Sequence, residues 1–222
     1  MNTMKDIRFS IIIIFLLILN LKTFATAQIP DLMVIDKDTF FMHTNPLEIY
    51  LDSIGNRDFP DFVGGGSTAC WRGYQAVWRV ENDSLFLEKI QSCHRDEGDI
   101  DANLHKMFRD KFINGRVYAD WYTGLIVLPH GRLKQYVHMG YASTYSKYLL
   151  LEISRGQFKQ ELKFNNRQYE SFKTKQFELF KRTPEYKKTV ENLKKEGYED
   201  QKFIDSFFRS YVINYTSMIL NE

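Results

Sequence analysis

The chain has 222 residues, of which 44% are hydrophobic and 15% aromatic, and its formal net charge is +2. This composition excludes a disordered segment, because chains that stay unfolded combine low hydrophobicity with high net charge. It also argues against a nucleic-acid partner, because the basic side chains are interleaved with acidic ones and form no single-sign block.

The N-terminus has the three parts of an export signal, which we assign to residues 1–27. Lys5 and Arg8 precede an apolar run over residues 11–19, and Ala25-Thr26-Ala27 supplies a cleavage site with small residues. The apolar run has only about half of the 20 residues that a membrane-spanning helix needs. We therefore expect cleavage before Gln28, with an uncleaved N-terminal anchor as the alternative.

The first cysteine of the chain is Cys70, so no thiol next to the signal could carry a lipid anchor. No later segment is long and apolar enough to predict a second membrane span. We expect a mature protein that is soluble, not lipid-anchored, and located in the periplasm or outside the cell.

Residues 36–153 hold short apolar runs bounded by Gly, Pro, Asn and Asp, a pattern typical of strands. The clearest is a β-hairpin over residues 71–90, with its turn at Glu81-Asn82-Asp83-Ser84. Its alternation places Trp78 in the core and Trp71 on the opposite, more polar face.

A second hairpin is predicted over residues 116–139. Its turn is expected at Pro129-His130-Gly131, because proline presets φ for a turn and glycine accepts the positive φ that follows. Residues 145–153 predict a further strand. One helix is expected to interrupt the sheet, with Asp99 or Asp101 as its N-cap.

After about residue 163 the apolar period becomes helical. Thr183-Pro184 predicts the start of a second C-terminal helix, which should end at Gly197. The third helix carries an apolar stripe that we expect to be buried, and this stripe includes Phe207, Phe208, Tyr211 and Tyr215.

Strands followed by helices predict the α+β class. We expect an antiparallel β-rich domain over residues 28–163, built from hairpins and one interrupting helix. About three helices over residues 164–222 should pack on the same domain.

Two segments carry a resemblance to known sequences. They are Thr68-Ala69-Cys70-Trp71-Arg72-Gly73-Tyr74 with Trp78, and Tyr136-Val137-His138-Met139-Gly140-Tyr141. Together they resemble an uncharacterised family of exported bacterial proteins, over about residues 40–155. The resemblance implies export and a single β-rich unit, but it carries over no catalytic residue and leaves the helical part outside.

The chain has no sequence signature of a cofactor or metal site. Residues 64–67 (Gly-Gly-Gly-Ser) lack the Lys-Ser/Thr ending of a phosphate-binding loop. The acidic run at Asp99 and Asp101 departs from a calcium loop, because Leu104 replaces the required glycine and Asp110 the required glutamate. The five histidines show no zinc-like spacing with each other or with the two cysteines.

Two functions from different classes stay open. The first is a non-enzymatic module that binds a protein, peptide or glycan through a surface with Trp71, Arg72 and His130, because exposed aromatics beside polar groups serve recognition. The second is a small exported hydrolase in which His138 and Asp120 form a catalytic pair in space. A third reading, in which the aromatic C-terminal helix docks on a membrane or a partner, is disfavoured by the mixed charges of its polar face.

Cys70 and Cys93 are predicted to form a disulfide, because thiols are not kept reduced outside the cytosol. Pairing Trp78 with Leu85 across the first hairpin brings the two cysteines opposite each other. A register shifted by two residues, with a turn centred on Asn82-Asp83, would separate them unless a bulge intervenes.

Overall fold

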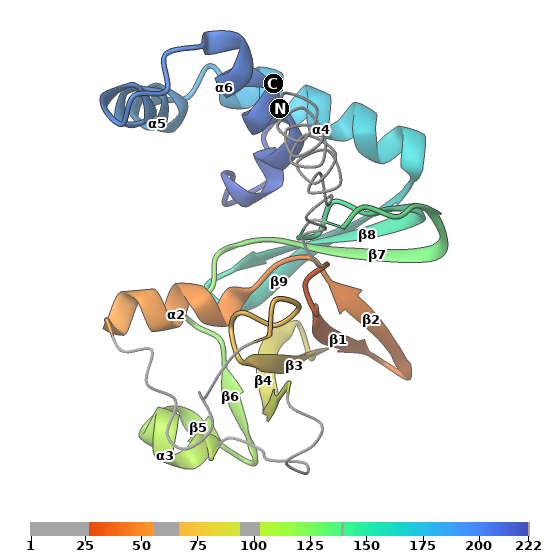
Figure 1. Cartoon of the computed structure of the whole chain (residues 1–222). Coiled ribbons are helices and arrows are strands. Elements are labelled where there is room, and N and C mark those ends of the chain that lie inside the picture. Colours follow the sequence, from red (N-terminus) through yellow and green to blue (C-terminus); the bar gives the residue numbers. More distant parts are fainter. Residues whose placement is uncertain (1–26, 56–66, 94–102, 139, 222) are drawn as a thin grey trace, which may run out of the picture.

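The computed structural model describes residues 27–55, 67–93, 103–138 and 140–221. Within this part of the chain there are nine strands and five α-helices, three of them C-terminal, so the predicted α+β class is confirmed (Figure 1). The strands are β1 (Asp31–Ile35), β2 (Asp38–Met42), β3 (Tyr74–Glu81), β4 (Ser84–Ser92), β5 (Phe112–Ile113), β6 (Arg116–Tyr118), β7 (Gly124–Gln135), β8 (Thr144–Ser154) and β9 (Gln157–Asn165). The helices are α2 (Pro46–Ile54), α3 (Leu104–Phe108), α4 (Asn166–Phe180), α5 (Pro184–Lys195) and α6 (Gln201–Tyr211), with short 3₁₀ turns η2 (Arg109–Lys111) and η3 (Val212–Asn214).

Some predicted features lie outside the described residues. They are the export signal apart from Ala27, the helix caps Asp99 and Asp101, and the glycine run at 64–66.

The strands form one mixed, largely antiparallel sheet that curls on itself. Its main path is β2-β1-β3-β4-β9-β8-β7, and β6 attaches β5 to β4. Only β1 and β3 are parallel among the paired strands of the described residues. The first and last strands of the path approach each other, because the N–H of His43, just after β2, donates to the carbonyl of Val127 in β7 at 2.8 Å.

Residues 124–129 of β7 and 148–151 of β8 are buried on both faces, which explains their nearly continuous apolar runs. Ile126 and Leu151 point to the core enclosed by the curled sheet. Val127 and Leu150, one residue along each strand, point to a second core beneath the C-terminal helices. The pair of strands therefore separates the two layers seen in Figure 1, with α4 to α6 on one side and β1 to β4 on the other.

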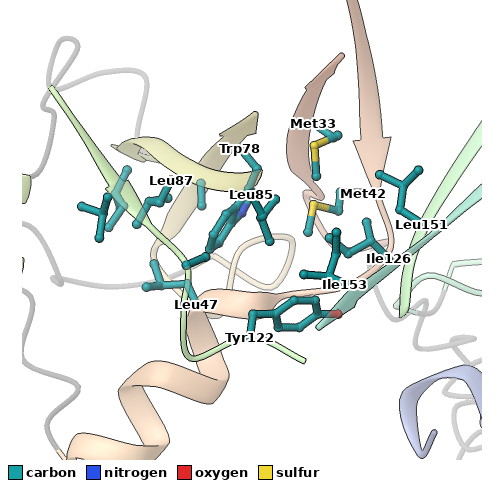
Figure 2. Close-up of a cluster of buried hydrophobic side chains, with 14 of the residues drawn as sticks. Met33, Met42, Leu47, Trp78, Leu85, Leu87, Tyr122, Ile126, Leu151 and Ile153 are labelled. Atoms are coloured by element: carbon teal, nitrogen blue, oxygen red, sulfur yellow. The ribbon is translucent and has the colours of Figure 1, made fainter. Parts of the chain in front are cut away.

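The first core is built around Trp78, which is fully buried as its strand alternation predicted. Figure 2 shows Trp78 of β3 between Leu85 and Leu87 of β4, with Met33 of β1 and Met42 of β2 beyond Leu85. These side chains close the interior of the curled sheet against β7 and β8.

The first predicted hairpin is confirmed as β3 and β4, but its register differs from the predicted pairing. Trp78 faces Leu87 and not Leu85. The turn is centred on Asn82 and Asp83, whose φ angles of 48° and 54° are typical of a two-residue hairpin turn that follows the sheet twist. A bulge between Val77 and Trp78 changes the register a second time, in the part of the hairpin nearer its open end.

The predicted disulfide between Cys70 and Cys93 is confirmed, although strand register alone does not bring the cysteines together. Cys70 lies in a turn before β3, and its Cα is 6.4 Å from that of Cys93, just after β4. Gly73 shapes this turn with a φ of 76°, and its N–H donates to the carbonyl of Cys70 at 3.0 Å. The turn folds the chain back over the open end of the hairpin.

The second predicted hairpin is wrong. β6 pairs with β4 and β5, whereas β7 continues through Pro129-His130-Gly131 and pairs with β8. Proline is accepted inside β7 because the main chain of Val127, two residues earlier, points away from β8 and bonds to His43 and Thr44. Pro129 has the same orientation, so its missing N–H removes no ladder hydrogen bond with β8.

The predicted interrupting helix is present as α3, but it is short. Its N-cap is Asn103, whose side chain accepts a hydrogen bond from the N–H of Lys106 at 3.0 Å. The helix ends at Phe108 and passes into η2.

The three C-terminal helices begin at side-chain caps. Asn165 and Gln168 form a capping box at α4, Thr183 caps α5 as predicted, and Asp200 caps α6. Within the described residues no helix is long and apolar enough to cross a membrane.

The predicted burial of the α6 stripe is only partly correct. Ile204 and Phe208 are buried in the second core, between α4, α5 and the sheet. Phe207 and Tyr211 are exposed because the buried face of α6 is narrower than its apolar stripe. Tyr215, which follows η3, is exposed as well.

Two adjacent phenylalanines test this assignment. Phe208→Ala should lower the free energy of unfolding by about 3–5 kcal/mol, because it leaves a cavity in the second core. Phe207→Ala, the matched control on the exposed face, should cost about 1 kcal/mol or less. Urea unfolding of both variants measures the difference, and equal losses would contradict the described orientation of α6.

Candidate functional site

The main candidate site is a cleft between α2 and the C-terminal segment, which we call the Trp71 cleft. Its volume is about 540 Å³, within the range usual for ligand sites. Its walls come from Asn45, Glu48 and Asp52 at α2, from residues 122–125 at the start of β7, from residues 213–217, and from Trp71.

The polar groups of this cleft are carboxylates, amides and hydroxyls. Glu48 and Asp52 lie one helical turn apart and line the same wall. Asn214, Thr216 and Ser217 face them from the C-terminal segment, and none of the described lining residues is Lys, Arg or His. The cleft therefore suits a neutral or cationic ligand with many hydrogen-bonding groups.

Trp71 is the aromatic element of the cleft and is 58% exposed, although it lies in the turn before β3 and not on the strand whose parity suggested its exposure. The residues on both sides hold it in place. Cys70 is buried and bonded to Cys93, and Arg72 is buried in an ion pair. A large apolar side chain is thus presented to solvent from a fixed main chain.

Arg72 was expected to share the binding surface with Trp71, but its guanidinium lies inside the protein. Its Nη2 is 3.2 Å from Asp31 Oδ1, and both side chains are almost fully shielded from solvent. The same nitrogen donates to the carbonyl of Ile29 at 2.9 Å, and Nη1 donates to Asn45 Oδ1. Arg72 positions this region from within and does not touch the cleft.

Asp31 completes the buried ion pair. Its carboxylate accepts hydrogen bonds from the N–H of Ala76 at 3.1 Å and from Nε1 of Trp78 at 3.3 Å. Burial raises the pKa of Asp31 to about 6, while the Arg72 charge and these two hydrogen bonds act to lower it. The carboxylate is ionised at neutral pH because Arg72 compensates its charge.

Asn45 connects this ion pair to the cleft. It occupies the N-cap position of α2, yet its side chain does not cap the helix. Its Oδ1 accepts hydrogen bonds from Arg72 and, at 3.0 Å, from the hydroxyl of Tyr141. On the next turn, Glu48 accepts a hydrogen bond from the hydroxyl of Tyr74 at 2.5 Å. Arg72, Tyr74 and Tyr141 therefore hold Asn45 and Glu48 of the α2 wall in place without lining the cleft themselves.

A second cavity of about 390 Å³, the His43 cavity, lies between β8, α4 and the end of α6, and it shares Ile213 and Asn214 with the Trp71 cleft. The ring of His43 stacks on Tyr141, with the centroids 4.8 Å apart. Burial lowers the pKa of His43 to about 4, so this imidazole is neutral at physiological pH. Lys173 and Glu170 form an ion pair at 3.0 Å on the opposite wall.

The structure does not bring the predicted catalytic pair together. Asp120 precedes β7 and accepts hydrogen bonds from Lys111 at 2.7 and 2.8 Å. His138 follows the other end of β7, and its ring lies 4.4 Å from that of Tyr136. Twelve residues of strand separate the two positions.

His130, the third predicted binding residue, does not line the Trp71 cleft. It lies on β7, half-buried, with its ring 5.6 Å from Phe40. It contributes to a different surface hollow, formed with β2, β8 and β9.

Comparisons with known proteins give no further guidance. The chain matches no family model, no curated protein and no solved structure. The resemblance to a family of exported bacterial proteins stays a prediction. Within the described residues, no group of three or more His, Cys, Asp or Glu side chains is placed to hold a metal ion.

Sequence reasoning missed the α2 side of the cleft. Asn45-Pro46 is a recognisable helix start, because proline is favoured in the first turn and asparagine at the N-cap. Glu48 and Asp52 then follow at a spacing that puts both on one face. No sequence signal pointed to the buried partner of Arg72, since Arg72 lies in the turn before β3 and Asp31 in β1, far earlier in the chain.

The ion pair gives a direct stability test. Arg72→Met should lower the free energy of unfolding by about 3–5 kcal/mol, because Asp31 is left buried without a compensating charge. Arg79→Met, which removes an arginine paired with Glu88 near the surface, should cost about 1 kcal/mol or less. Similar losses in chemical denaturation would show that the buried pair has no special structural role.

Proposed function

We propose that the protein is an exported, non-catalytic binding module whose ligand occupies the Trp71 cleft. The observation that carries this proposal is the exposed indole of Trp71, held over a polar cleft by a disulfide and a buried ion pair. Exposed aromatics on a rigid main chain bind well, because little conformational entropy is lost when the ligand arrives.

A hydrolase built on His138 and Asp120 is the weaker candidate, because the two residues lie at opposite ends of β7. The pKa of His43, which stacks on Tyr141 in the neighbouring cavity, is lowered to about 4 by burial, and this is far from the pKa of a general base tuned to neutral pH. A binding function, unlike a hydrolase, does not require His138 and Asp120 to lie close together.

Export is supported by the three-part signal in the sequence and by the disulfide. Disulfides form and persist in oxidising compartments and are rare in the cytosol. The Cys70–Cys93 bond also closes a loop with a sequence separation of 23 residues, which stabilises the fold by about 3 kcal/mol in the chain-entropy model.

If the protein is exported, two measurements on one purified sample should agree. N-terminal sequencing of the protein from the periplasm or medium should begin at Gln28 or close to it. Thiol labelling of the same protein, denatured without reductant, should find no reactive cysteine. A chain that keeps its first residues in the membrane fraction, or that has two reactive thiols, would contradict the proposal.

The binding proposal is tested with arrays of immobilised glycans and peptides. The wild-type protein should retain a defined subset of these probes, and Trp71→Ala should weaken retention at least about tenfold, as expected for a central aromatic anchor. Tyr136→Ala removes an equally exposed aromatic at the far end of β7 and should leave retention unchanged. Equal behaviour of both variants would exclude the cleft as the site, and release of cleaved products from the probes would show an enzyme.

A further inference from the structure

The exposed aromatics of α6 form a row along one side of the helix. Phe203, Phe207 and Tyr211 follow at intervals of four residues, which places them one above the other on one face. Phe203 is 56% exposed, and Phe207 and Tyr211 are each more than a third exposed. We call these three residues, together with Tyr215, the aromatic row.

The aromatic row is continuous with the Trp71 cleft. The ring of Phe207 lies 5.0 Å from that of Tyr211 and 6.1 Å from that of Tyr215, measured between centroids. Tyr215 in turn lines the cleft opposite α2, whereas Tyr211 lines the neighbouring His43 cavity. A ligand that leaves the cleft past Tyr215 therefore meets Phe207 and then Phe203.

The chemistry of the cleft selects among ligand classes. Carboxylates, amides and hydroxyls line it together with an exposed indole, and its described lining holds no basic side chain, so a polyanion would be repelled by Glu48 and Asp52. Sugar rings match this set, because their hydroxyls pair with such groups while their apolar faces lie flat on aromatic rings. A repeated row of aromatics then matches a ligand that repeats.

We propose that the ligand is a linear, uncharged glycan, bound at one segment in the Trp71 cleft and continuing over Tyr215, Phe207 and Phe203. This inference rests on the proposed binding function and names the ligand class for that same site. The polar side chains beside the row, Lys202, Ser206 and Ser210 among them, are exposed and can pair with hydroxyls of the chain.

The test is the dependence of affinity on chain length. Calorimetric titration with cello- and chito-oligosaccharides, from disaccharide to hexasaccharide, should show tighter binding as the chain grows, by about fivefold for each additional stacked ring. The double variant Phe203→Ala/Phe207→Ala should bind the disaccharide like the wild type but lose the gain with length. Phe41→Ala, which removes an exposed phenylalanine on β2, should keep that gain.

The possible outcomes distinguish failure of the glycan proposal from failure of the proposed binding function. If the disaccharide binds and Trp71→Ala abolishes its binding, but affinity does not rise with length, the extended site is overturned and the cleft stands. If no oligosaccharide binds while Trp71→Ala still weakens binding of a peptide probe, the glycan class is overturned but the binding module is not. If sedimentation shows dimers that Phe203→Ala/Phe207→Ala dissociates, the row is an interface between copies of the chain and the inference fails.

Discussion

The ion pair between Asp31 and Arg72 is the constraint on which the candidate site depends. Two charges that are shielded from water are costly unless each compensates the other and their remaining hydrogen-bonding groups find partners. Here Asp31 accepts from Ala76 and Trp78, which fixes β1 beside β3. Arg72 donates to Ile29 and Asn45, which fixes the chain before β1 and the start of α2. If either side chain moved away, the other would be left as an unpaired charge in an apolar interior. The ion pair therefore fixes β1, β3, the chain before β1 and the start of α2 relative to one another.

This arrangement determines how much order the cleft has before a ligand arrives. Trp71 lies between a residue bound by a disulfide and a residue bound by the ion pair, so its main chain has little freedom left. Glu48 is held through Tyr74, whose pKa is raised mainly by burial and also by the nearby carboxylates, so its hydroxyl stays protonated and remains a donor. Because the conformational entropy of these side chains is already lost on folding, little more is lost on binding. A site with few contacts can then be selective.

The sequence was sufficient for features that depend on local chemistry and insufficient for those that depend on distant partners. Turn residues, helix caps and a change of apolar period predicted the α+β class, the hairpin of β3 and β4, and the start of α5 at Thr183. The strand β9 was missed because its side chains are mostly polar and exposed. Pro129 indicated a turn because proline is acceptable in a strand only at a sheet edge. The sequence did not show that β7 ends the sheet path. Arg72 looked like a surface residue because its partner Asp31 lies 41 positions away in the sequence.

The position of Pro129 also bears on how the molecule behaves at high concentration. Among the described strands β7 pairs only with β8, so its outer edge is a place where a strand from another molecule could add. Near Val127 that edge is already bonded to the segment after β2. Beyond it, Pro129 offers no N–H, and the exposed Arg132 and Lys134 place charges along the rest of the strand. An incoming strand would find its hydrogen-bond ladder interrupted, and this protects the curled sheet from edge-to-edge polymerisation.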